Sequence, residues 1–142
     1  MQISSRFTIA THIMLCIYFF SEKEKVTSEF LSKSTNINPV IIRNILGQLK
    51  KSGLVKIARG TGGAKIAQPI DEITLLDLYK AAQSVDKDNL FNFHENPNNM
   101  CPVGRNIHKV LDDKLIDAQQ ALENQLKKTT LKELIDKLNQ NI

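Results

Sequence analysis

The chain has 142 residues, 42% of them hydrophobic and 24% charged, and a net charge of +4. This balance excludes global disorder, and the length suits one ordinary domain that can bury a core. Two cysteines are too few for a disulfide framework and indicate a reducing cytoplasm. The apolar run from Ile13 to Phe20 is too short to span a bilayer, so no membrane partner is expected.

Charge is unevenly distributed along the chain. Residues 30–70 hold seven basic and no acidic side chains, a net of +7, whereas the remainder holds 12 basic and 15 acidic residues, a net of −3. This asymmetry favours a polyanion as the partner of the basic segment. The alternative is a basic face that is merely solvated.

The first half of the chain predicts three helices. Ser4 or Ser5 can cap a helix that ends near Phe20, and Thr27 can cap a short second helix over 28–35. A third helix follows, with Asn38 as its N-cap, Pro39 at its first position and Gly53 as its C-terminal stop. Its inward stripe consists of Ile42, Ile45, Leu46 and Leu49.

A β-hairpin is predicted next. Residues 54–58 and 64–68 alternate like strands around the turn "RGTGG". Helix, short helix, basic-faced helix and hairpin is the order of a winged helix-turn-helix, in which the hairpin is the wing. A nucleotide-binding loop is a poor alternative, because Ala64 precedes Lys65 and Ile66 follows it where the Walker motif has Gly and Ser or Thr.

The second half predicts another helix in "DEITLLDLYKAAQ", a polar connection over 86–100 and a long helix from Pro102 to about Lys128. At 1.5 Å per residue the long helix measures roughly 40 Å. The winged head cannot cover this length, so a second copy is expected against part of it. A final helix begins with a capping box, Thr130 with Glu133. The apolar stripe of the long helix is Ile107, Leu111, Leu115, Ala118, Leu122 and Leu126.

The predicted fold is therefore mainly α with a small β-hairpin, a winged helix-turn-helix head plus a long dimerisation helix. The expected division is a DNA-binding domain over 1–83, a linker or sensor loop over 84–101, and the dimerisation and C-terminal helices over 102–142.

The third helix and the wing carry the candidate DNA contacts. Arg43 could pair with guanine, Asn44 with adenine, and Val40 could touch a thymine methyl group. Arg59 and the glycines of the turn suit phosphates or a narrow minor groove. The predicted DNA-binding set is Ser5, Arg6, Asn38, Val40, Arg43, Asn44, Lys56, Arg59, Gly60, Gly62, Gly63 and Lys65.

Cys101 is a second candidate site. Pro102 at the first helical position places Cys101 at the N-cap, where the helix end lowers a thiol pKa, and Arg105 could help. The alternative is that Cys101 only occupies the junction before the long helix and has no chemical role. Cys16, inside an apolar helix, is expected to be inert core. His94, Cys101 and His108 have no compact metal spacing, so neither a metal site nor an enzyme is indicated.

The stretches "LKKSGLVKIARGTGGAKIAQP" and "ITLLDLYKA" resemble the helix-to-wing signature of the Rrf2 family of dimeric winged-helix regulators. The resemblance covers nearly the whole chain. It implies a transcriptional regulator, usually a repressor, that binds a palindromic DNA operator as a homodimer. Val40, Arg43, Asn44 and Arg59 occupy the family's DNA-contacting positions.

The chain departs from the family's iron–sulfur members, which carry three cysteines and usually a histidine three residues after the third. Cys101 matches the third cysteine, but Gly104 replaces the histidine and no cysteine lies between residues 83 and 100. No cofactor is therefore expected. The resemblance is to the cluster-free branch, in which a lone cysteine like Cys101 can sense oxidants. The alternative signal is a small ligand or a partner protein.

Overall fold

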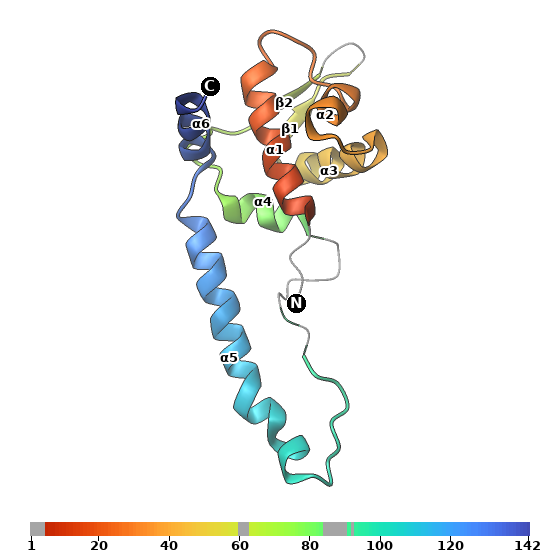
Figure 1. Cartoon of the computed structure of the whole chain (residues 1–142), viewed down its shortest axis with the longest axis vertical. Coiled ribbons are helices and arrows are strands. Elements are labelled where there is room, and N and C mark those ends of the chain that lie inside the picture. The colour runs from red at the N-terminus through yellow and green to blue at the C-terminus, as the bar shows by residue number, and fades with distance from the viewer. Residues whose placement is uncertain (1–4, 60–62, 84–90, 92) are drawn as a thin grey trace.

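The computed structural model describes residues 5–59, 63–83, 91 and 93–142. Its elements are α1 (Ser5–Phe20), α2 (Ser28–Thr35), α3 (Pro39–Lys51), β1 (Val55–Ile57), β2 (Ala64–Ile66), α4 (Leu75–Ala82), α5 (Pro102–Lys127) and α6 (Leu131–Gln140). The predicted fold class, mainly helical with a two-stranded antiparallel hairpin, is confirmed. α5 runs away from a head formed by all the other elements (Figure 1).

The predicted N-caps of α2 and α3 are confirmed by their hydrogen bonds. The Thr27 side chain accepts a hydrogen bond from the backbone N–H of Phe30, and Asn38 accepts one from that of Val40. α3 ends one residue before Ser52, and Gly53 adopts a φ of 76°, which glycine takes without strain. The N-cap at Asn38 and the left-handed Gly53 therefore define where α3 begins and ends.

The hairpin is tied to the segment before α2. Val55 pairs with Ile66, and the N–H of Ala64 donates to the carbonyl oxygen of Val26 over 2.9 Å. Gly63 lies so close to this segment that an added Cβ would come within 2.3 Å of the Val26 nitrogen. A residue with a side chain does not fit there. The wing base is consequently part of the packed head.

The core belongs to the head, and α6 completes it. The N–H of Leu131 donates to the carbonyl oxygen of Ile73 over 2.7 Å, and the N–H of Leu75 donates to that of Thr129. The C-terminal end of α5 thus lies at the head, where α6 follows and packs on the core, while α5 itself has no buried residue. The largest fully buried side chains include Ile13, Ile17, Leu31, Ile42, Ile45, Leu49, Leu78 and Leu131.

Two details of the second half differ from the sequence reading. The helix after the wing begins only at Leu75, where Thr74 and Asp77 form a reciprocal capping box that the sequence analysis did not identify. At α6 the Thr130 side chain accepts a hydrogen bond from the Glu133 N–H, as half of the predicted box requires. α5 spans Pro102–Lys127, in agreement with the predicted end near Lys128.

Candidate nucleic-acid interface

The outward face of α3 is open to solvent. Its inward stripe is buried as predicted, which turns Val40, Arg43 and Asn44 outward, and all three are exposed. Within the described part of the chain, neither the Arg43 nor the Asn44 side chain has a hydrogen-bond partner, so both can engage a ligand. The side-chain oxygen of Asn38 accepts the capping hydrogen bond from Val40, which leaves the side-chain N–H groups of Asn38 free to donate to a ligand.

Side-chain contacts hold α3 in its orientation. Arg6 of α1 donates from Nη2 to Oε1 of Gln48 over 2.7 Å. Gln48 in turn donates from Nε2 to the carbonyl oxygen of Gln83, just after α4, over a longer 3.4 Å. Arg6, predicted to contact phosphate, therefore has a partner within the protein and orients α3. Ser5 is exposed at the first turn of α1, and its carbonyl oxygen accepts from Thr8.

Basic side chains line one face of the wing. Lys56 and Lys65 stand directly opposite each other in the strand register, and both are exposed. Like charges in such a pair repel, so the arrangement favours an anionic partner that neutralises both. Arg59 is exposed next to the wing tip. Two predicted wing residues, Gly60 and Gly62, lie outside the described residues.

Gly63 belongs to the base of the wing. Its backbone packs against Val26, so it has a clear structural reason to be glycine. Most members of the predicted DNA set are therefore exposed, as a DNA-binding face requires. Its exposed members are Ser5, Asn38, Val40, Arg43, Asn44, Lys56, Arg59 and Lys65, whereas Arg6 and Gly63 shape the head.

Gln48 and Gln83 are functional candidates that the sequence analysis missed. The sequence analysis gave no role to Gln48 or to the end of α4. Their partners lie 42 and 35 residues away in sequence. No local pattern encodes contacts at such separations, so only the folded chain identifies them.

Cys101 lies at the N-cap of α5, as the position of Pro102 predicts. The backbone N–H groups of Gly104 and Val103 lower the pKa of the Cys101 thiol, because they stabilise the thiolate. Arg105 is not among the causes of the lowered Cys101 pKa.

The residues around Cys101 do not fit an iron–sulfur cluster. A Cβ added at Gly104 would lie 2.3 Å from the carbonyl oxygen of Asn98, so the histidine of cluster-binding relatives has no room there. The sequence offers no other cysteine between residues 83 and 100. Across the described ranges no group of three or more His, Cys, Asp or Glu side chains could hold a metal ion.

None of the helices described here is both long enough and apolar enough to cross a bilayer.

Known proteins share this arrangement. The family model Rrf2, described as an iron-dependent transcriptional regulator, matches residues 3–137. YwnA of Bacillus subtilis (strain 168), named as an HTH-type transcriptional regulator, is 38% identical over 137 residues, covering 96% of this chain and 99% of YwnA.

Solved structures agree. A crystal structure described as a DNA binding protein is 34% identical, with a TM-score of 0.74 and coverage of 92% of this chain and 99% of that one. CymR, the global cysteine regulator of B. subtilis, shares the fold at 19% identity, with a TM-score of 0.68 and coverage of 96% and 97%. With its wing, basic α3 and long α5, the chain belongs to the Rrf2 family of DNA-binding transcriptional regulators.

Proposed function

We propose that this regulator is a homodimer that represses transcription by binding a palindromic operator. The observation that carries the proposal is α5, which spans 26 residues without burying one of them. Val103, Val110 and Leu111 leave apolar surface open along one side of it. A second α5 with the same stripe would cover this surface and hold two heads at a fixed distance.

In this dimer each head reads one half-site. α3 enters the major groove with its N-terminal turn first, where Arg43 and Asn44 reach base edges and Val40 meets a thymine methyl group. Lys56, Lys65 and Arg59 contact phosphates beside the groove. With two-fold symmetry, the half-site centres lie about 34 Å apart, or a multiple of that distance. The corresponding division of labour is a head over 1–83, a linker over 84–101 and a dimerisation unit from residue 102 onward.

We further propose that oxidation of Cys101 releases the operator. The lowered pKa of its thiol raises the fraction of thiolate, the form that a peroxide oxidises to sulfenic acid with transfer of one oxygen. Cys101 sits where the linker meets α5, so a modified side chain there would alter how the heads are set on the dimer helices.

The test is operator binding by the reduced protein, measured with DNA from upstream of its own gene at two salt concentrations. We expect tight binding that weakens steeply with salt, because several phosphates are neutralised at once. Mild peroxide should abolish binding, and a thiol should restore it. A Cys101→Ser variant should bind the operator as tightly as the wild type, and peroxide should not release it. If it releases the operator as wild type does, Cys101 is not the sensor.

A second candidate is the same regulator controlled by a small ligand. The observation that favours it is a cavity of about 520 Å³ on the head, away from Cys101. Operator binding that is indifferent to peroxide in the wild-type protein would favour this candidate over the thiol switch.

A further inference from the structure

α1 has more apolar surface than the core uses. Ala10, Ile13, Met14 and Ile17 face the core and are buried. Leu15 and Phe19 lie on another side of the helix and are only half-buried. A soluble helix that is apolar on two sides needs a second apolar contact. The second side of α1 forms the wall of a cavity.

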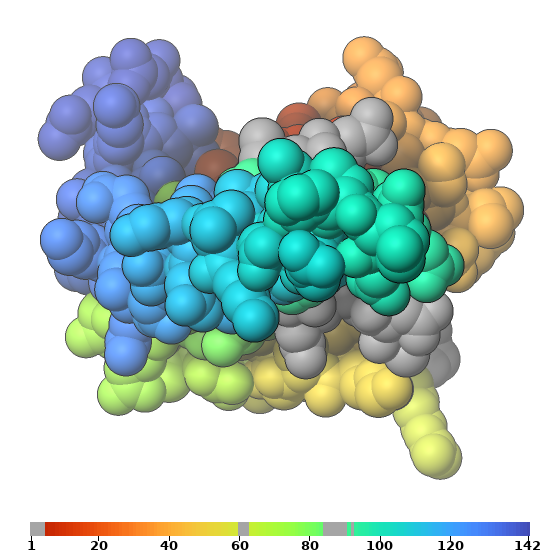
Figure 2. All heavy atoms as spheres, turned by 90° about the horizontal axis from the view of Figure 1, so that it is seen from below, coloured from red at the N-terminus to blue at the C-terminus, as the bar shows by residue number. Residues whose placement is uncertain are grey.

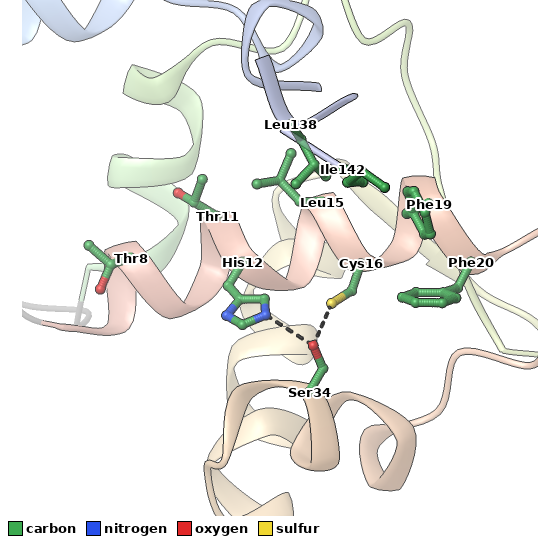
Figure 3. A pocket seen from close by; sticks show the side chains of 10 residues that line it. All are labelled: Thr8, Thr11, His12, Leu15, Cys16, Phe19, Phe20, Ser34, Leu138 and Ile142. Carbon is green, nitrogen blue, oxygen red and sulfur yellow. Dashed lines mark hydrogen bonds between the residues drawn. The ribbon is translucent and has the colours of Figure 1, made fainter. Parts of the chain in front are cut away.

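The cavity lies between α1, the end of α2 and α6 (Figure 3). Its volume of about 520 Å³ falls within the range of small-molecule sites in proteins. Leu15, Phe19 and Leu138 give it an apolar body. Because α6 supplies one wall, the cavity exists only after the chain has returned from α5 to the head.

One wall of the cavity is polar. The hydroxyl oxygen of Ser34 lies 3.0 Å from Nε2 of His12 and 3.1 Å from Sγ of Cys16, as the dashed lines in Figure 3 show. His12 is exposed at this wall, and the described residues give its Nδ1 no partner. Cys16, expected to be inert core, is buried but joins this polar group.

We propose that this cavity binds a small effector with an aromatic or aliphatic body and one hydrogen-bonding end, of the kind represented by a phenol. The body would pack between Leu15, Phe19 and Leu138. The polar end would meet Ser34 and His12, which offer both a donor and an acceptor. An apolar enclosure with a few convergent polar groups is the usual composition of such sites.

Ser34 connects the cavity to α3 through the chain. Ser34 lies in the last turn of α2, and the next residues form the turn that leads into α3. That turn is fixed by short contacts: Asn36 is left-handed with a φ of 56°, and Ser32 donates to the carbonyl oxygen of Ile37. An effector held by Ser34 would therefore shift the end of α2 and the approach of α3 to DNA.

This regulatory consequence rests on the proposed operator binding, whereas effector binding does not. The two are measured separately. The probes are p-cresol and toluene, which differ by a hydroxyl group, added to the reduced full-length protein labelled with ¹⁵N and observed by NMR. We expect saturable shifts of the amide signals of Leu15, Phe19, Ser34 and Leu138, with tighter binding of p-cresol than of toluene.

Variants test the geometry. Ser34→Ala should weaken p-cresol binding between about twofold and tenfold, the effect of one hydrogen bond, and leave toluene binding unchanged. Leu15→Trp or, should that variant fold poorly, Thr11→Trp should fill the cavity and remove binding of both probes. Tyr18→Trp is the matched control, because Tyr18 lies on α1 but does not line this cavity.

Absence of saturable shifts at these residues, or binding that survives both cavity-filling variants, would overturn the inference. So would nuclear Overhauser contacts from a second copy to the cavity in a mixed-labelled dimer, since the copy would then be its occupant. For regulation, p-cresol should change the operator affinity of the wild type but not of Leu15→Trp. Binding without this change would overturn the regulatory step alone. Loss of operator binding under every condition would instead overturn the proposed function.

Discussion

The head and α5 are both helical, but only the head has a buried core. α1 buries five of its 16 residues, whereas α5 buries none of its 26. Figure 2 shows α5 as the layer nearest the viewer, with α6 and α2 behind it at opposite sides. Isolated helices gain little stability in water without tertiary packing. The contrast indicates that the head is stable through its own core, whereas the apolar surface of α5 would be covered only in the proposed dimer.

The largest expected effect comes from a charge on the open side of α5. Val110→Glu should raise the dissociation constant of the proposed dimer at least about a hundredfold, because an unpaired buried charge costs about 3–5 kcal/mol. Operator binding should fall with it. Analytical ultracentrifugation and operator titration measure the two effects.

Gln120→Glu is the control for this change. Gln120 is exposed and already polar, and it lies about 80° around α5 from Val110, so the same new carboxylate should leave assembly intact there. A Val110→Glu protein that remains dimeric at low concentration would show that the open side of α5 is not the dimer surface.

A smaller effect is expected on α3 of the head. Arg43→Ala should weaken operator binding by about 1–3 kcal/mol and relax specificity at one base pair, as loss of a bidentate guanine contact does. Arg43→Lys keeps the positive charge but lacks the planar guanidinium that donates two hydrogen bonds to guanine. It should therefore lose nearly as much specificity as Arg43→Ala. Binding to a panel of operators with single substitutions measures both. If Arg43→Lys keeps full specificity, Arg43 contacts phosphate only.

Alanine substitutions at three glycines test how much the head and α5 each contribute to the stability of the protein. Gly63→Ala should destabilise the head by about 1–3 kcal/mol, because the added methyl group meets the backbone of Val26. Gly104→Ala meets the Asn98 backbone equally closely, but Gly104 lies in the first turn of α5, so the change should disturb residues 98–104 with little effect on the head. Gly47→Ala, with nothing within 4 Å, should stabilise α3 by up to about 1 kcal/mol.

Urea unfolding and amide hydrogen exchange separate these three outcomes. Equal losses of global stability in Gly63→Ala and Gly104→Ala would contradict the view that the core belongs to the head alone.

The smallest effect concerns thiol reactivity. In the folded protein the lowered pKa keeps Cys101 as thiolate to lower pH than a free cysteine. Its alkylation by iodoacetamide should therefore rise with pH at a lower midpoint than in urea-unfolded protein. Cys16, which is buried, should stay unmodified until the protein unfolds. Mass spectrometry resolves the two sites. Coincident pH profiles for folded and unfolded Cys101 would contradict the stabilised thiolate.

Much of the head could be read from the sequence because its signals are local. Helix caps at Thr27 and Asn38, the glycine after α3 and the alternation on both sides of the wing turn act within a few residues. The exposed face of α3 followed from the same spacing, since burial of Ile42 and Ile45 forces Arg43 and Asn44 outward. Cys101 at the N-cap of α5 was likewise fixed by its proline neighbour.

What the sequence determined by itself was therefore the kind and order of the elements, the basic segment and the side chains on the outer face of α3. The tertiary structure alone decided that α6 packs back on the head, that Arg6 holds Gln48 rather than standing free, and that α1 borders a cavity beside Ser34. The physical reason is distance along the chain. Helix capping and hydrophobic periodicity depend on interactions between residues that are close in sequence. The contacts named above join residues that are far apart in sequence and that only the packed core brings together.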